Sequence, residues 1–421
     1  MSNIKQELFK GVFWSAVEKY SGLLISLVVS MVLARMLGPK EYGVVAIATV
    51  IISFLQMFCT MGIGPAIIQR TDLTNKELDS IFTFSVSVGF VFSIIFFCSS
   101  WGIASFYDNQ QLVPVCQILS IQLLAVSANM VPNALMTRDK RFKEIAKRTL
   151  FLQILTGFVS VYAAFTGAGV YSLLISPVVT SIGVFIWNRN YYQVNIDWSY
   201  NLNPIKKIFS FSSYQFLFNF VNYFSRNLDK LIIGRWMSVD ALGIYEKSYR
   251  LMQLPLQNVT GIVSPVMQPV FREISDDRHD LGAKYAKIVK FIATLSFPIG
   301  IILSCMSSEI IHFFYGDKWD DAIPVFSILA LSLPFQMILS TSGSMFMVCN
   351  NTKAQFWVGI RNTITTVAGF LIAVFIWNTI DAMAWAWTIT LFVNFFCSYY
   401  VMYKFVLHIS IKPFLKELLK P

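Results

Sequence analysis

The amino-acid sequence predicts an all-α, polytopic membrane protein with about 12 transmembrane helices. Of the 421 residues, 56% are hydrophobic and 13% are charged, whereas soluble globular domains carry about 25% charged residues. The mean hydropathy is +0.60. This composition excludes a soluble enzyme, a disordered chain and a disulfide-rich secreted scaffold, and it supplies enough apolar residues for about twelve spans of about 20 residues.

Twelve apolar segments follow one another along the chain, separated by short connections. They cover roughly residues 11–36, 42–64, 80–106, 113–136, 149–166, 169–188, 208–236, 241–264, 288–314, 323–347, 355–377 and 382–404. The first follows MSNIKQELFK without a small-residue cleavage site, so we expect a membrane helix rather than a removed signal peptide. No connection could hold a separate soluble domain, which needs at least about 50 residues.

Positive charges are unevenly distributed between the two sets of loops. The chain has 33 Lys and Arg against 23 Asp and Glu, a net charge of +10. If the N-terminus is cytoplasmic, the cytoplasmic loops hold most of the cations, including the cluster 138–148. The opposite loops then hold only Arg35, Lys40, Arg235 and Lys318. This is the bias of the positive-inside rule, so we expect an inner-membrane protein with both termini in the cytoplasm and no nucleic-acid partner.

The two halves of the chain resemble each other. LARMLGPKEYG at 33–43 aligns with IGRWMSVDALG at 233–243, and FYD at 106–108 aligns with FYG at 314–316. Six spans per repeat give both halves the same orientation, the parallel arrangement found among secondary transporters. We therefore expect two six-helix bundles around a central cavity. The expected parts are a bundle at 1–188, a cytoplasmic linker at 189–207, a bundle at 208–404 and a cytoplasmic tail at 405–421.

Polar residues recur along one face of three predicted spans. The seventh span carries Gln215, Asn219, Asn222, Arg226, Asp229 and Lys230, the eighth carries Glu246, Arg250, Gln253 and Gln257, and the first carries Ser15, Glu18, Lys19, Gly22, Ser26 and Ser30. Ionisable groups in a bilayer usually face a cavity or a partner, so we expect an aqueous cleft. For the first span, close helix packing through Gly and Ser is the alternative.

Six cations and three carboxylates lie inside the spans, a net charge of +3 that suits an anionic substrate. The cations are Lys19, Arg226, Lys230, Lys247, Arg250 and Arg361, and the carboxylates are Glu18, Asp229 and Glu246. Because guanidinium groups bind phosphate oxygens in a bidentate manner, we predict an anion site at Arg226 and Arg250. Lys19, Lys230, Asn219, Asn222 and Gln253 complete the predicted substrate-binding set.

The three carboxylates are candidates for an ion-coupling site. A structural alternative exists for two of them, since Glu246 and Arg250 are spaced i, i+4 and Arg226 and Asp229 are spaced i, i+3. At these spacings each carboxylate could simply neutralise its arginine.

No motif points to catalysis, a cofactor or a metal. The six cysteines form no CxxC pair and the three histidines lie far apart. The pairs Asp276–Asp277 and Asp320–Asp321 fall in short loops, where solvated charge explains them. A Gly-rich phosphate loop and a Ser/His/Asp set are absent from the sequence, so we expect no enzyme activity and no cofactor.

Short motifs in both halves carry a family resemblance. They are LARMLGPKEYG at 33–43, GIGPAIIQR at 62–70, LMTRDKRFK at 135–143, LDKLIIGRWMSVDALGIY at 228–245, RLMQLP at 250–255 and FYGDKWDDAIPVFSILAL at 314–331. As a set they resemble the polysaccharide transporters of the multidrug/oligosaccharidyl-lipid/polysaccharide flippase superfamily, the Wzx-type and colanic or teichuronic acid exporters. Many members of that family carry two spans more than predicted here.

The resemblance implies a flippase for an undecaprenyl-diphosphate-linked oligosaccharide, a repeat unit of O-antigen, capsule or exopolysaccharide. Its expected partners are this lipid-linked oligosaccharide, membrane lipids and a polysaccharide polymerase or other assembly protein. Together with the repeat, it predicts alternating access by rocking of the two bundles.

Other functions would leave different marks in the sequence. A drug or metabolite antiporter of the same superfamily, the retained alternative, would have an acidic or apolar cavity, and here the stripes are net basic. An O-antigen polymerase or ligase would carry a large external loop. A major-facilitator transporter would carry a basic Gly/Asp/Arg signature in the loop near 65–79, and this loop lacks it.

The charge bias predicts the orientation of two loops. With the six native cysteines replaced, Asp139→Cys should resist an impermeant thiol reagent in intact cells, whereas Lys318→Cys should react. Labelling of position 139 from outside would overturn the orientation.

Overall fold

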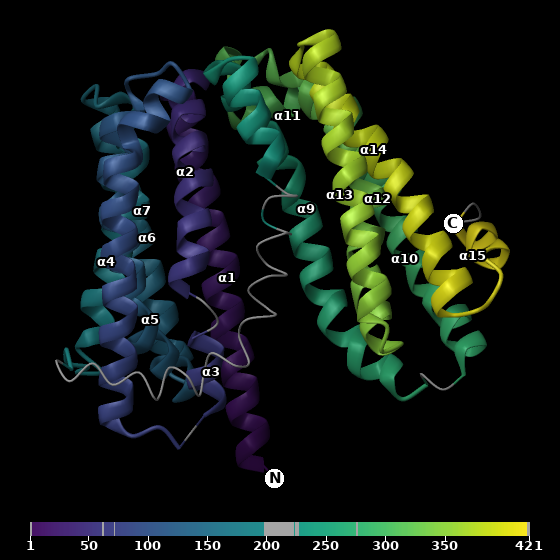
Figure 1. Ribbon diagram of the computed structural model, residues 1–421, viewed down its shortest axis with the longest axis horizontal. Helices are drawn as coiled ribbons and strands as arrows, with labels where there is room; N and C mark the ends of the chain where they lie inside the picture. Colours follow the sequence, from purple (N-terminus) through teal and green to yellow (C-terminus); the bar gives the residue numbers. More distant parts are fainter. Residues whose placement is uncertain are drawn as a thin grey trace. The chain divides into compact units, whose positions relative to one another are not determined.

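The structure, a computed structural model, describes residues 2–60, 63–70, 72–197, 223, 227–274 and 277–418 (Figure 1). Within these ranges every regular element is a helix, and ten helical segments are long and apolar enough to cross a membrane. The expected all-α, polytopic fold is therefore confirmed.

The ten candidate spans match ten of the twelve predicted segments. The seventh, 208–236, is described only at 223 and over a helix at 227–236. The eighth lies within α9 (Val239–Arg272), a helix of 34 residues that is long enough to span but is not among the ten. The polar stripe predicted for this helix explains the difference.

Contacts divide the chain into two units, Met1–Asn227 and Leu228–Pro421. The helices of the first unit are α1 (Ser2–Met36), α2 (Pro39–Thr60), α3 (Ile63–Gln69), α4 (Asn75–Phe106), α5 (Leu112–Arg138), α6 (Phe142–Phe165) and α7 (Ser172–Arg189). In this unit α4 and α7 pack on α5, and α1 packs on α6. The predicted linker and bundle boundaries fall partly on 198–222, outside the described residues, so they stay predictions.

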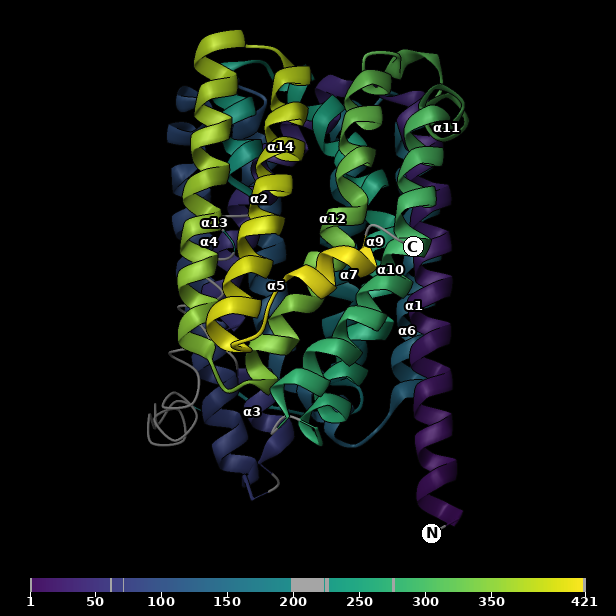
Figure 2. The same ribbon diagram turned by 90° about the vertical axis from the view of Figure 1, so that its right-hand side faces the viewer.

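The second unit is also built of long helices, with short helices at other places in the order. Besides 227–236 and α9 it contains α10 (Arg278–Cys305), α11 (Ser307–Phe314), α12 (Ala322–Val348), α13 (Thr352–Ile372), α14 (Ile380–Val401) and α15 (Lys412–Leu418). Figure 2 shows α10, α12, α13 and α14 side by side, and α12 packs against α9, α10 and α14.

The same turn ends α5 and α12. Lys140 and Asn350 have positive φ angles of 56° and 53°, and each is the second residue after the end of its helix. The N–H of Arg141 donates to the carbonyl of Met136 at 3.0 Å, and the N–H of Asn351 donates to the carbonyl of Phe346 at 2.9 Å. This is the Schellman termination of a helix. The two turns lie 210 positions apart, close to the offset of 208 between FYD at 106–108 and FYG at 314–316.

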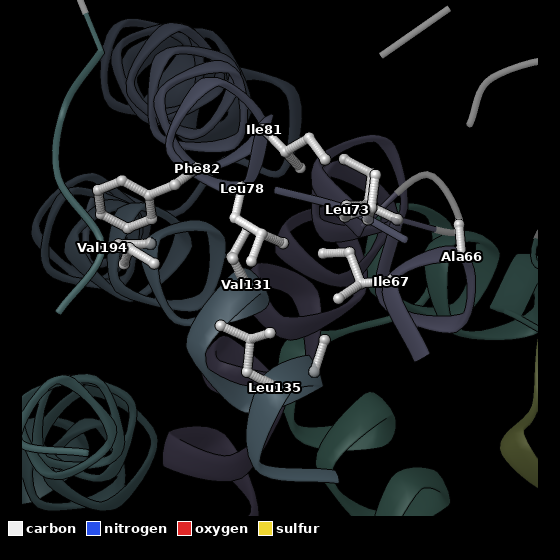
Figure 3. Close-up of a cluster of buried hydrophobic side chains, with 12 residues drawn as sticks. Ala66, Ile67, Leu73, Leu78, Ile81, Phe82, Val131, Leu135 and Val194 are labelled. Atoms are coloured by element: carbon white, nitrogen blue, oxygen red, sulfur yellow. The ribbon is translucent and has the colours of Figure 1, made fainter. Parts of the chain in front are cut away.

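A cluster of buried apolar side chains fixes the short helix α3 against α4 and α5 (Figure 3). Ile67 and Val131 are fully buried, and Ile81 is 1% exposed. Val194, from the segment after α7, packs into the same cluster. The cluster therefore joins four parts of the first unit at one end of its helices.

The predicted tail, 405–421, packs against the second unit over much of its length. In α15 the ring of Phe414 is 1% exposed and lies 4.6 Å from the ring of Tyr399 and 4.9 Å from that of Tyr403, centroid to centroid. Lys290 of α10 pairs with Glu417 at 3.1 Å. Aromatic stacking and one ion pair thus dock α15 on α10 and α14 (Figure 1).

Two glycines let the central helices of each unit approach closely. A Cβ added at Gly89 of α4 would lie 2.3 Å from the Ser127 Cβ of α5, and one added at Gly300 of α10 would lie 3.0 Å from the Pro334 Cδ of α12. Because lipid offers no hydrophobic drive between helices, close approach at small residues is a main source of their packing energy.

Gly89→Ala should destabilise the protein by about 1–3 kcal/mol, because the added methyl group overpacks the α4–α5 contact. Gly102, on the same helix, has no atom within 4 Å of an added Cβ. Gly102→Ala should therefore be neutral or stabilising by up to about 1 kcal/mol, as expected of Gly→Ala within a helix. Thermal unfolding of the two purified variants tests this, and equal effects would contradict it.

Candidate functional site

An ion pair between neighbouring helices lies at the centre of the candidate site. Lys230 Nζ, from the helix at 227–236, is 2.7 Å from Glu246 Oε2 of α9, and the two side chains are 13% and 25% exposed. Ser238, between the helices, caps α9 by accepting the N–H of Ala241 at 3.0 Å. The short connection brings residues 230 and 246 face to face.

The sequence spacing offered Arg250 as the partner of Glu246, but the structure pairs Glu246 with Lys230. Lys230 Nζ also lies 5.6 Å from the ring centroid of Tyr249, one helical turn beyond Glu246. Lys230 is therefore held by a carboxylate and an aromatic face, and most of its charge is neutralised locally.

Asp229 is fully buried beside this pair. Its Oδ1 accepts the backbone N–H of Lys230 at 2.9 Å. The Tyr245 hydroxyl lies beside this carboxylate and interacts with it, although no hydrogen bond of regular geometry joins Tyr245 to Oδ2 in the part of the chain that the structure describes. Arg226, the partner offered by the sequence, lies outside the described residues, as do Asn219 and Asn222.

Lys247 adds a second buried cation. Its side chain is 2% exposed, and its Nζ lies 4.9 Å from the ring centroid of Tyr315, which follows α11. The Tyr315 hydroxyl donates to the Lys247 carbonyl at 3.5 Å. The FYG motif of the second repeat thus supplies an aromatic face for a lysine of α9.

Arg250 differs from these groups because it is exposed and forms no ion pair with any residue in the described ranges. It lies close enough to Lys230 and Lys247 to repel them electrostatically. Among the described residues, three basic side chains (Lys230, Lys247, Arg250) face two carboxylates (Asp229, Glu246), so one basic group, with its formal positive charge, is in excess. The exposed guanidinium is where a ligand could reach that charge.

The remaining predicted residues lie apart from this cluster in the contacts described. Gln253 accepts a hydrogen bond from Gln257 within α9 at 3.1 Å. In the first unit, Glu18 Oε1 accepts the Thr149 hydroxyl of α6 at 2.9 Å. Lys19 is exposed, with its Nζ 5.8 Å from the ring centroid of Tyr20.

Arg148 was expected among the cytoplasmic loop cations and not as a buried residue. The structure corrects this, because Arg148 lies on α6 and is 5% exposed. Its Nη1 donates to Oδ1 of Asn188 and, at 3.4 Å, to Oδ1 of Asn133. Asn188 in turn donates to Asn129 at 2.8 Å. The missed signal is a polar stripe on α6 that begins beside it: Thr149, Gln153, Thr156 and Ser160 recur at steps of four and three.

Arg361 has a similar environment in the second unit. Its guanidinium donates to the Asn394 carbonyl and to the Ser398 hydroxyl of α14, both at 3.4 Å. Each unit therefore holds an arginine of its fifth predicted span, α6 or α13, against neutral oxygen acceptors that include groups of the sixth, α7 or α14. Among the described residues, no group of three or more His, Cys, Asp or Glu side chains could hold a metal.

The ion pair makes a prediction about stability. Lys230→Gln should destabilise the protein by about 3 kcal/mol, because it leaves the Glu246 carboxylate in a largely buried site without its partner. Adding Glu246→Gln should recover most of this loss, and Arg250→Gln should leave stability unchanged. A double-mutant cycle measures the coupling by thermal unfolding of the wild type, Lys230→Gln, Glu246→Gln and the double variant. Additive effects of the two substitutions would contradict the pairing.

Known proteins resemble the chain along its whole length. The sequence profile of the polysaccharide biosynthesis protein family matches residues 32–324. Teichuronic acid biosynthesis protein TuaB of Bacillus subtilis (strain 168) is 25% identical over 100% of this chain and 87% of its own length. Lipopolysaccharide biosynthesis protein WzxC of Escherichia coli (strain K12) is 23% identical over 100% and 85%.

A solved structure shows the same fold. Lipid II flippase MurJ, in an inward closed conformation, superposes with a TM-score of 0.76 at 17% identity and covers 97% of this chain and 90% of its own. The family resemblance predicted from the motifs is confirmed. The chain belongs to the polysaccharide biosynthesis protein family and has the multi-helix fold of a membrane transporter.

Proposed function

We propose that this protein is a flippase that moves an undecaprenyl-diphosphate-linked oligosaccharide across the cytoplasmic membrane by alternating access. The single observation that carries the proposal within the structure is the exposed, unneutralised guanidinium of Arg250 in a cluster with a surplus positive charge. Family membership and the names of the relatives, two of which act in polysaccharide biosynthesis and one of which flips lipid II, support it.

The chemistry of the substrate fits the charge of the site. A diphosphate loses its hydration when it enters a low-dielectric layer, and a fixed cation offsets part of that cost. Arginine stays charged at any relevant pH and presents a planar fork to phosphate oxygens. Lys230 is paired with Glu246, and Lys247 is buried against the ring of Tyr315. Arg250 is therefore the basic group that would contact the diphosphate first.

The depth of Arg250 also supports the proposal. Arg250 follows Val239, the first residue of α9, by 11 positions, which is about 16 Å along a helix at 1.5 Å per residue. Half the thickness of the hydrocarbon core is about 15 Å. Transporter substrate sites are generally near this midplane. Arg226, Asn219, Asn222, Gln253 and Lys19 remain proposed contributors on the grounds of sequence alone.

Among the candidate ion-coupling carboxylates, Asp229 is the one we favour. Glu246 is paired with Lys230, and Glu18 accepts the Thr149 hydroxyl, so both have partners in their own unit. Asp229 is fully buried, and the Tyr245 hydroxyl beside it makes no hydrogen bond of regular geometry to Oδ2, so a proton or a cation could bind at this oxygen.

The alternative, a drug or metabolite antiporter, is disfavoured by the sign of the charge. A site for cationic drugs would need a surplus of carboxylates, and this cluster has one cation in excess. We further propose that both termini are cytoplasmic, that the protein is not an enzyme and that a polysaccharide polymerase or other assembly protein is its partner.

Arg250→Gln should lower export of surface polysaccharide about tenfold or more, because the loss of one charged hydrogen-bonding contact costs about 1.5–3 kcal/mol. Its level in the membrane should stay normal, since Arg250 is exposed and forms no ion pair with the residues that the structure describes. Arg250→Lys should retain part of the activity. The assay is complementation of a strain that lacks this protein, with surface polysaccharide and membrane protein measured together.

Lys40→Gln serves as the matched control, because Lys40 is also an exposed cation but lies in a predicted external loop. It should export normally. Normal export by Arg250→Gln at a normal protein level would refute the assignment of the anion site.

A further inference from the structure

The first unit contains a cavity that the proposed transport site does not use. It measures about 350 Å³ and lies among α4, α5, α7 and the segment that follows α7. Phe82, Ala125 and Ala128 form its buried wall, and Phe185 and Ile121 form its sides. Apart from Arg189, the side chains that line it are apolar. Its volume lies at the lower end of the range for ligand sites, about 300–1,000 Å³.

One end of the cavity is closed by residues 191–197, which we call the strap. Its Val194 lies beside the ring of Phe82 in Figure 3, and both line the cavity. The Asp197 N–H donates to Thr83 Oγ1 at 2.7 Å, and the Asn195 N–H donates to Asp79 Oδ1 at 2.9 Å. These bonds tie the strap to α4 over the end of the cavity that carries the predicted cytoplasmic loops.

The other end of the strap is tied to the turn between α5 and α6. The Tyr192 hydroxyl donates to Asp139, and the guanidinium of Arg141 lies 5.2 Å and 5.6 Å from the ring centroids of Tyr191 and Tyr192. The strap is therefore anchored on two sides, and a ligand would not enter the cavity by way of this segment.

The cavity opens at a surface suited to lipid. Ile121, on its rim, is 50% exposed, and on the same helices Phe90 and Ile186 are 55% and 57% exposed. Such apolar exposure on membrane-spanning helices is suited to contact with acyl chains. A ligand that enters here comes from the bilayer and must itself be apolar over most of its length.

A single cation marks the end of the cavity that would meet a head group. Arg189, the last residue of α7, lines the cavity and is exposed. It forms no ion pair in the ranges that the structure describes. Ile182, also in the lining, precedes it by seven residues, or about 10 Å along the helix. The cavity thus extends from a guanidinium group at the predicted cytoplasmic interface into the apolar layer.

We propose that this cavity binds the isoprenoid tail of the lipid-linked substrate in the cytoplasmic leaflet, with Arg189 beside the phosphate. The inference rests on the proposed function for the identity of the lipid. A volume of about 350 Å³ has room for one chain and not for two, so only the isoprene units next to the head group of a single-tailed polyprenyl lipid would lie inside it. The site would hold the substrate in the correct leaflet before its head group moves toward Arg250.

Photolabelling tests the inference directly. The probe is undecaprenyl phosphate with a diazirine on the isoprene units next to the head group, added to the full-length protein in phosphatidylcholine nanodiscs. We expect labelled peptides from α4, α5 and α7, and competition by unlabelled undecaprenyl phosphate. Labelling confined to other helices would overturn the proposal. Equal competition by phosphatidylglycerol would do so as well, by identifying a general phospholipid site.

Substitutions in the cavity sharpen the test. Ala125→Trp fills the cavity and should reduce labelling at least tenfold, whereas Val91→Trp, on the exposed face of α4, should not. Arg189→Gln should reduce labelling several-fold, whereas Lys40→Gln should not. If Ala125→Trp does not purify as a folded protein, Ala125→Leu replaces it. Arg189→Gln should fold normally, because Arg189 is exposed. Unchanged labelling in the cavity and arginine variants would refute the site.

The export assay separates this inference from the proposed function. Normal export by a folded Ala125→Trp variant, together with loss of export by Arg250→Gln, would refute the tail site and leave the flippase proposal standing. A different outcome would support a polyprenyl-lipid site in a protein with another function. In that case Ala125→Trp loses probe labelling, while export is normal both in the Arg250→Gln strain and in a strain that lacks the protein.

Discussion

A charged side chain inside a bilayer must find a partner, because hydrocarbon offers it none, and the polar residues of both units follow this constraint. Lys230 pairs with Glu246, Lys247 lies on the ring of Tyr315, and Arg148 and Arg361 are held by amide, carbonyl or hydroxyl oxygens. Each of these contacts joins different helices or the segment beside one, so the groups that are costly to bury also fix how the helices pack. Arg250 is the informative exception, since its charge is left accessible.

The remaining packing depends on close approach more than on polar contact. Gly89 and Gly300 lie 211 residues apart, each on a helix that packs against the next long helix of its unit. The turns at Lys140 and Asn350 match in their φ angles and hydrogen bonds. Most of the residues between these markers differ between the two halves, so what the repeat preserves is the places where backbones touch or reverse direction.

Local patterns in the sequence were sufficient for the fold class, for ten of the spans and for the family. Hydropathy and helix length are properties of adjacent residues, and the motifs that carry the resemblance are short.

The pairing of charged side chains was harder to predict, since helical periodicity assigns a residue to a face of its helix without identifying the helix opposite. For this reason the helical spacing indicated Arg250, four residues away, as the partner of Glu246, whereas the structure pairs Glu246 with Lys230 on another helix. Arg148 was assigned to a loop because it closes a run of basic residues, and only its contacts with Asn188 and Asn133 reveal its burial. Three predicted site residues lie outside the described residues and remain predictions from the sequence: Arg226, Asn219 and Asn222.

The docking of α15 has a consequence for the order in which the second unit is built. Phe414 completes an aromatic group with Tyr399 and Tyr403, and it is translated after every helix on which α15 packs. The rings of Tyr399 and Tyr403 therefore stay partly uncovered until this late segment has left the ribosome and folded back. During that interval a nascent chain differs from a finished one by an exposed aromatic surface, which a membrane chaperone or protease could use to tell them apart.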